Sequence, residues 1–86
     1  MRLDVQQQGD RTLIRAEGRL DAAWSDHLME AVRGHIREGR HRIWLDGSGL
    51  DYMSSAGVRA LLRCRREVEA VNGSFGVLRA SPFVRD

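Results

Sequence analysis

Two adjacent serines, Ser54 and Ser55, are the residues of this chain whose type and setting best suit chemistry. The small polar run Gly47-Ser48-Gly49 precedes them, and Ala56-Gly57 follows and leaves room for another protein's backbone. A serine hydroxyl donates and accepts hydrogen bonds, so it can be a nucleophile, a phosphoryl acceptor or a helix N-cap. If Ser54 is the cap, Ser55 is the first helical residue. Its hydroxyl then lies near the positive helix end, which accommodates a phosphate.

Two kinds of enzyme could also use the serines or the glycine-rich run before them. A serine hydrolase is disfavoured because Met53 stands where the first glycine of Gly-x-Ser-x-Gly belongs, and no histidine follows Ser55. A nucleotide-binding enzyme is disfavoured because Gly47-Ser48-Gly49 lacks the lysine of a phosphate-binding loop, and the chain has no lysine. We therefore expect no catalytic residue, no cofactor and no enzymatic activity.

Metal and nucleic-acid sites are also disfavoured. Cys64 is the single cysteine and the three histidines are scattered, whereas a zinc site needs convergent ligands. Four arginines between residues 59 and 66 make one predicted helix basic, but glutamates follow at once and the formal net charge is only +2. We expect no bound metal and no nucleic-acid partner.

The elements that position the serines follow from hydrophobic periodicity. Apolar and polar residues alternate at 3–7 and 12–16, which predicts two strands joined as an antiparallel hairpin by the turn at Gly9-Asp10. Short apolar runs predict further strands at 42–46 and 74–78.

Two long helices are predicted from apolar residues at helical spacing. Asp21 or Ser25 caps the first, and Gly39 stops it. The second begins at one of the two serines and stops at Asn72-Gly73, a left-handed cap. Ser81-Pro82 has the form of a third helix start.

This order of elements predicts an α/β fold with one domain over residues 1–86. The sheet is mixed and flanked by helices, because the crossovers after the first hairpin impose parallel pairing. The C-terminal helix is expected to be truncated at the end of the chain. The loops expected at 18–21 and 47–55 follow parallel strands and should lie together at one edge of the sheet. The predicted core residues are Ile14, Leu28, Val32, Ile43, Leu45, Leu61, Leu62 and Val77.

The N-terminus lacks the apolar stretch of a secretory signal, and no apolar run is long enough to span a bilayer. We therefore expect a cytoplasmic protein without membrane contact.

The segment around the serines resembles the signature of the STAS family, the anti-sigma factor antagonists; residues 44–62 read WLDGSGLDYMSSAGVRALL. Residues 18–21 resemble that family's segment after its second strand, and residues 81–85 resemble its entry to a C-terminal helix. The resemblance covers essentially the whole chain.

The resemblance implies a partner-switching regulator. In that family a serine kinase that is also an anti-sigma factor phosphorylates the antagonist, and a PP2C-type phosphatase reverses the reaction. The motif places the phosphoacceptor on Ser55. Ser54 is the alternative, because it stands where many members have an aspartate directly before the acceptor. The implied partner-binding residues are Asp21, Tyr52, Met53, Ser54, Ala56, Gly57 and Arg59.

The same resemblance allows a second interpretation. Some STAS domains are never phosphorylated and serve in stressosome-like scaffolds, anion transporters or lipid-transport complexes. The chain would then be a scaffold or an accessory subunit, and either interpretation leaves its oligomeric state open.

Overall fold

Four strands and two long helices alternate along residues 2–78, the part of the chain that the computed structural model describes. The elements are β1 (Arg2–Gln8), β2 (Arg11–Leu20), α1 (Ala22–Arg37), β3 (Arg42–Met53), α2 (Ser55–Ala70) and β4 (Ser74–Leu78). The strands form one sheet in the order β1-β2-β3-β4, antiparallel for the first pair and parallel for the others. The predicted mixed sheet is confirmed, while the predicted C-terminal helix lies outside the described residues.

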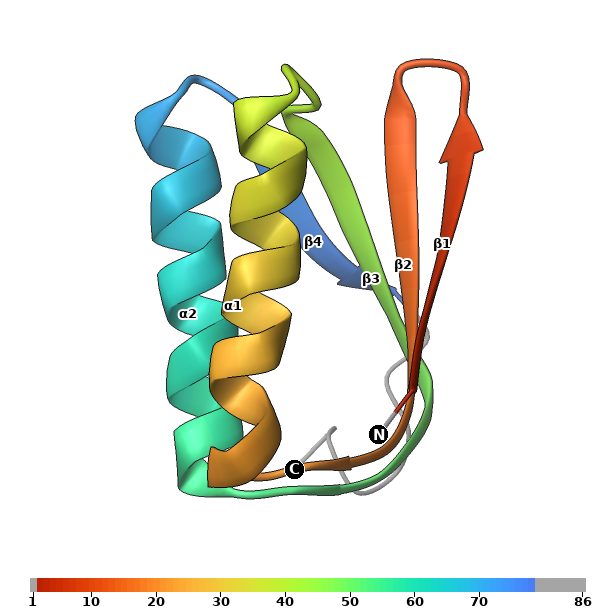
Figure 1. Ribbon diagram of the computed structural model, residues 1–86, viewed down its shortest axis with the longest axis vertical. Coiled ribbons are helices and arrows are strands. Elements are labelled where there is room, and N and C mark those ends of the chain that lie inside the picture. Colours follow the sequence, from red (N-terminus) through yellow and green to blue (C-terminus); the bar gives the residue numbers. More distant parts are fainter. Residues whose placement is uncertain (1, 79–86) are drawn as a thin grey trace.

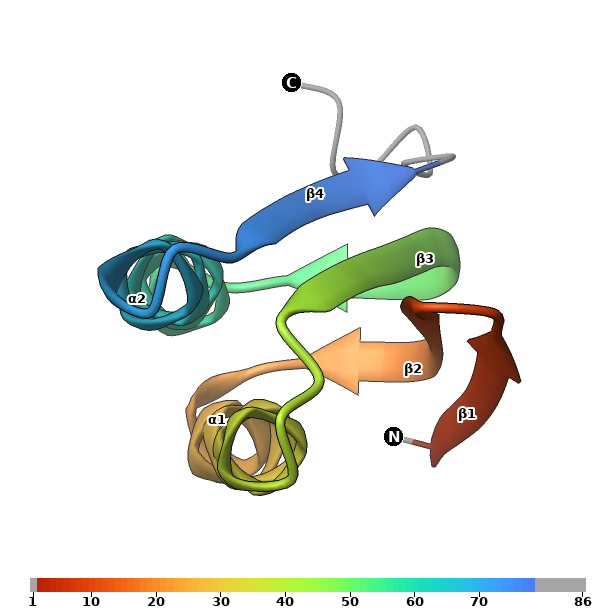
Figure 2. The ribbon, with the colours of Figure 1, turned by 90° about the horizontal axis from the view of Figure 1, so that it is seen from above.

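Both helices cover the same face of the sheet. Figure 1 shows them running side by side from the same end of the molecule, and Figure 2 shows the sheet on one side of the pair. Apolar side chains from the inward faces of β2, β3 and both helices fill the space between the layers. This core consists of Ile14, Ala16, Leu20, Leu28, Met29, Val32, Ile43, Leu45, Leu50, Ala60, Cys64 and Val68.

Both predicted helix stops are confirmed. After α1, Gly39 adopts a φ of 82°, and its N–H donates to the carbonyl of Ile36 at 3.0 Å. After α2, Asn72 adopts a φ of 62°, and the N–H of Gly73 donates to the carbonyl of Val68 at 2.9 Å. Glycine and asparagine tolerate this left-handed conformation, which ends a helix while satisfying its last carbonyls.

The prediction of two loops at the carboxyl edge of the sheet is wrong, because most of the residues assigned to these loops belong to strands. β2 continues to Leu20 and β3 continues to Met53. These extensions pair with each other in parallel, Gly18 opposite Leu50 and Leu20 opposite Met53, with register shifts between Arg15 and Glu17 and after Gly18. Glycine disfavours strands locally, but the ladder between the two segments overrides that preference.

Part of the predicted core is also corrected. Leu62 and Val77 are 53% and 40% exposed, and Leu61 is only partly buried. The buried residues of α2 are Gly57, Ala60, Cys64 and Val68. β4 is an edge strand, so no described element covers the flank of α2 beyond it. The other predicted core residues are buried as expected: Ile14, Leu28, Val32, Ile43 and Leu45.

Candidate functional site

The ends of β2 and β3 bring the starts of both helices together. Leu20 and Met53 are register partners, and the N–H of Ser54 donates to the carbonyl of Leu20 at 3.0 Å. Asp21 and Ser54, the next residues along the chain, are the N-caps of α1 and α2. The prediction that these two segments meet at one edge is confirmed, although strands rather than loops deliver them.

The two serines have different environments. Ser54 has an extended backbone, with φ −84° and ψ 171°, and its side-chain oxygen accepts a hydrogen bond from the N–H of Gly57 at 3.2 Å. This is the geometry of an N-cap. Ser55 is the first residue of α2, and it is exposed. No acidic residue lies in the first turn of α2, so the positive helix end faces the Ser55 hydroxyl without a competing carboxylate from that turn.

Gly57 serves packing within the chain. It is buried, and a Cβ at this position would lie 2.6 Å from the carbonyl oxygen of Leu20 and 3.0 Å from a side-chain carbon of Met53. The expected room for a partner's backbone at Gly57 is therefore filled by Leu20. A glycine is needed here because α2 begins in contact with the end of β2.

Asp21 occupies the N-cap of α1 without capping it through its side chain. Its backbone carbonyl accepts hydrogen bonds from the N–H and the hydroxyl of Ser25, at 3.0 and 2.7 Å. Its Oδ1 atom is buried and has no hydrogen-bond partner among the described residues. Of the two predicted caps, Asp21 holds the N-cap position, whereas the alternative Ser25 is wrong, because Ser25 lies inside α1 and its hydroxyl donates back to the carbonyl of Asp21.

Tyr52 forms a cation–π contact beside the site. The guanidinium carbon of Arg19 lies 4.1 Å from the centre of the Tyr52 ring, and both side chains are exposed. The two residues are register partners on β2 and β3. Arg19 could not be selected from the sequence, because only the pairing of the two strands brings it over the ring.

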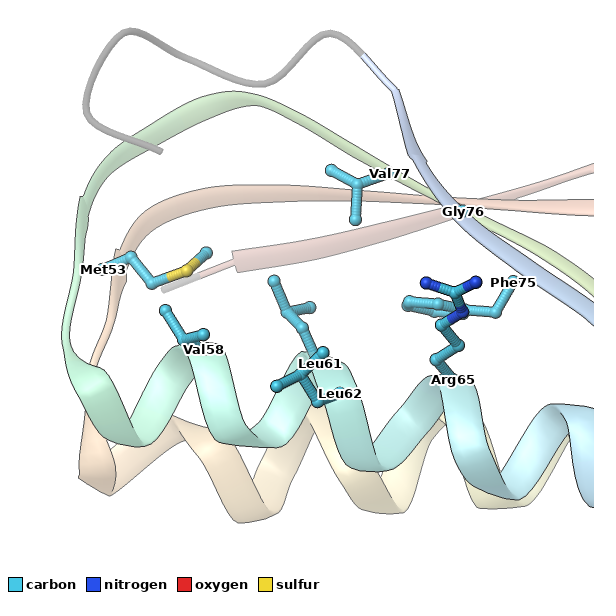
Figure 3. Close-up of a pocket in the computed structure, with 8 residues that line it drawn as sticks. All are labelled: Met53, Val58, Leu61, Leu62, Arg65, Phe75, Gly76 and Val77. Carbon is cyan, nitrogen blue, oxygen red and sulfur yellow. The ribbon is translucent and has the colours of Figure 1, made fainter. Parts of the chain in front are cut away.

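Met53 opens onto an apolar groove between α2 and β4, where the side chains converge from both elements (Figure 3). The groove has a volume of about 290 Å³. Leu62 and Val77 are exposed because both side chains line this open groove. The lining residues are Met53, Val58, Leu61, Leu62, Arg65, Phe75, Gly76 and Val77.

Ala56 and Arg59 line a second groove, here called the α1–α2 groove, of about 210 Å³. It lies between the N-terminal halves of the two helices, directly after Ser55. Ala56 is half-buried and Arg59 is exposed. The full lining is Ala22, Ser25, Asp26 and Met29 from α1 with Ala56, Arg59, Ala60 and Arg63 from α2.

Within residues 2–78, no group of three or more histidine, cysteine, aspartate or glutamate side chains is placed to hold a metal ion. In the same part of the chain, neither helix has the length and apolar character needed to cross a membrane.

Comparison with known proteins places this arrangement in a family. The family model described as "Mlab, STAS domain" matches residues 3–86. The protein BtrV of Bordetella bronchiseptica, named as an anti-sigma factor antagonist, is 30% identical over 70 residues, which are 81% of this chain. The chain spans 60% of the length of that relative.

Solved structures agree with this match. The anti-sigma factor antagonist SpoIIAA in its unphosphorylated form superposes with a TM-score of 0.80 at 28% identity, over 98% of this chain and 78% of that one. The phosphorylated form of SpoIIAA from Bacillus gives 0.78 at the same identity and coverage. A STAS domain from Rhodobacter sphaeroides, 21% identical, shares the fold with a TM-score of 0.76 over 95% of this chain and 92% of that one. The chain belongs to the STAS-domain family.

Proposed function

We propose that this chain is a partner switch controlled by reversible phosphorylation of Ser55. In the unphosphorylated state it binds a serine kinase that is also an anti-sigma factor, and phosphorylation releases it. A PP2C-type phosphatase restores the binding state. The observation that carries the proposal is the exposed Ser55 hydroxyl at the start of α2, beside a Ser54 whose side chain already caps the helix.

Ser55 suits a phosphoryl group better than Ser54 does. The oxygen of Ser54 accepts the hydrogen bond from Gly57, and modification of that oxygen would disturb the cap. A phosphate on Ser55 would meet the free N–H groups and the positive end of α2, which favour its negative charge. The domain should therefore stay folded after modification.

The chemistry of transfer belongs to the partner. This chain supplies a hydroxyl, whereas the kinase supplies the base, the magnesium ions and ATP. The proposed role accordingly needs no catalytic residue or cofactor in this chain. It also places the chain in the cytoplasm, where the ATP for the reaction is found.

Release follows from the charge that phosphorylation adds, about −1.5 to −2 at neutral pH. At an interface that charge must lose its water, which is costly unless the partner supplies matching cations. The proposed contact surface surrounds Ser55 and consists of Asp21, Tyr52, Met53, Ser54, Ala56 and Arg59, with Gly57 as a packing residue beneath it.

Phosphate mapping by mass spectrometry on the chain taken from its native host tests the site. Purified kinase and ATP should modify wild-type protein and Ser54→Ala, but not Ser55→Ala. Ser55→Ala should bind the kinase constitutively, and Ser55→Asp should bind it weakly. If Ser55→Ala accepts phosphate and Ser54→Ala does not, the acceptor is Ser54.

A second candidate is a STAS subunit of a larger complex that is never phosphorylated. It is favoured by the matching family model, whose description names the Mlab type rather than a phosphorylated antagonist. This role requires that neither serine carries phosphate in the host and that both alanine variants bind their partner like the wild type.

A further inference from the structure

We infer that the α1–α2 groove is the docking surface for an acidic helical segment of the partner, held by Arg59 and Arg63. The inference rests on the proposed function only for the identity of the partner as a kinase. The chemistry of the segment follows from the groove itself, which begins directly beside Ser55 with Ala56 in its lining.

The floor of the groove is built for close approach. Ser25, Met29 and Ala60 are buried at its base. Ala22 and Ala56 form its end next to the helix starts. Small side chains at a contact shorten the distance between packed helices, so a third helix can lie close against α1 and α2. A segment rich in small or flexible residues at its contact face would fit this floor.

The charge of the lining is unbalanced. Arg59 and Arg63 stand on the α2 side, and Asp26 is the only acidic residue among the described residues of the lining. Neither arginine makes an ion pair or side-chain hydrogen bond with another described residue, and Arg63 acts on Glu67 only through longer-range attraction.

Most other described arginines do have carboxylate partners. Arg33 contacts Glu67 at 2.8 Å, and Arg65, on the same helix as the groove arginines, contacts Glu69 at 3.4 Å. The groove therefore presents two guanidinium groups that no described carboxylate pairs. Arginine forms strong, geometrically specific bonds with carboxylates, which makes an acidic segment the matching occupant.

The spacing of the arginines defines the occupant further. Arg59 and Arg63 are four residues apart, which is about 6 Å along a helix axis. Two glutamates four residues apart on a facing helix have the same separation. The predicted occupant is thus a helix with glutamates at positions i and i+4.

The groove is also coupled to Ser55. Arg59 follows Ser55 by four residues, so the two side chains are neighbours on the surface of α2. A phosphate on Ser55 would attract Arg59 and compete with the carboxylates of the partner for it. One modification would then repel the partner and withdraw one of its two anchors.

The test uses the whole, ¹⁵N-labelled chain and no kinase, so that it can fail independently of the proposed function. The probe is a synthetic helical peptide with glutamates at i and i+4, and the reference peptide has glutamines there. At low salt, the glutamate peptide should shift the amide signals of residues lining the groove. Arg59→Gln and Arg63→Gln should each weaken binding about two- to fivefold, as exposed ion pairs do.

Arg66→Gln is the matched control, because Arg66 lies on α2, makes no ion pair with another described residue and is not among the described lining residues of the groove. It should leave the affinity unchanged. Phosphoserine placed at position 55 by genetic encoding should abolish the shifts at the groove. The inference is overturned if the glutamine peptide binds equally well, or if Arg66→Gln weakens binding as much as Arg59→Gln. Neither result would change the outcome of the kinase assay on Ser55, so this inference and the proposed function can fail separately.

Discussion

The side-chain oxygen of Ser54 accepts a hydrogen bond from the backbone N–H of Gly57, at 3.2 Å. This bond separates the structural serine from the exposed one. Ser54→Ala should lower the free energy of unfolding by about 1 kcal/mol, because the N–H of Gly57 loses its hydrogen-bond acceptor. Ser55→Ala should change it by no more than about 0.5 kcal/mol, as exposed substitutions do. Urea denaturation followed by circular dichroism measures both, and equal losses would contradict the assignment of the cap.

Gly57 should not tolerate a side chain. The Cβ of Gly57→Ala would lie 2.6 Å from the carbonyl oxygen of Leu20, which is backbone and cannot move freely. We expect a loss of about 1–3 kcal/mol in unfolding free energy from overpacking.

Gly34→Ala provides the control for Gly57→Ala. Gly34 lies inside α1, and the nearest atom to its added Cβ is the flexible end of Arg37 at 3.9 Å. Because alanine favours a helix interior, this variant should gain about 0.5–1 kcal/mol. A stabilised Gly57→Ala protein in the same denaturation experiment would show that α2 does not start against β2.

Truncation to alanine should destabilise the protein much more at Leu45 than at Leu62. Leu45 is 1% exposed in the core, whereas Leu62 is 53% exposed along the apolar groove. Leu45→Ala should lower the unfolding free energy by about 2–5 kcal/mol, because it leaves a cavity. Leu62→Ala should cost at most about 0.5 kcal/mol. Similar losses in both variants would mean that another segment covers the groove.

Acid should weaken the contact between α1 and α2. The guanidinium of Arg33 donates two hydrogen bonds to Glu67, at 2.8 and 3.0 Å, and this bonding holds the pKa of Glu67 below its ordinary value despite some desolvation. A lowered folded-state pKa gives stability that is present above the unfolded pKa and is lost as pH falls through the folded one. The stability difference between wild type and Glu67→Gln should therefore shrink in acid.

Urea titrations at a series of acidic pH values measure that difference. Glu69→Gln is the control, since Glu69 makes an exposed pair with Arg65 within the same helix. A difference for Glu67→Gln that stays constant across the series would exclude the proposed role of the Arg33 contact.

Cys64 should be unreactive in the native protein. Its thiol is fully buried and donates to the sulfur of Met29 at 3.3 Å, and burial raises the pKa of Cys64 to about 12. The thiolate is the reactive form, so iodoacetamide should modify the protein rapidly only after denaturation. The stability linked to this thiol is present below its unfolded pKa and falls as pH rises from there toward the folded value. Rapid alkylation of the native protein at neutral pH would contradict the burial.

Local sequence determined the type and order of the elements. Period-two alternation and helical spacing are properties of consecutive residues, so β1, both helices and β4 could be predicted without knowledge of the fold. The stops at Gly39 and Asn72 followed in the same way, because a left-handed residue ends a helix wherever it occurs. The motif at Ser54 and Ser55 also lies within one continuous segment.

Tertiary structure decided what depends on partners distant in sequence. The strand extensions 17–20 and 47–53 form because each segment supplies the hydrogen-bonding ladder of the other, which neither sequence reveals alone. Gly57 is confined by Leu20, and Arg19 meets Tyr52, through the same pairing. Leu62 and Val77 stay exposed because β4 is the edge strand of the sheet among residues 2–78. Hydrophobicity measures the tendency of a side chain to be buried, but only the packing of the layers determines which side chains have something to be buried against.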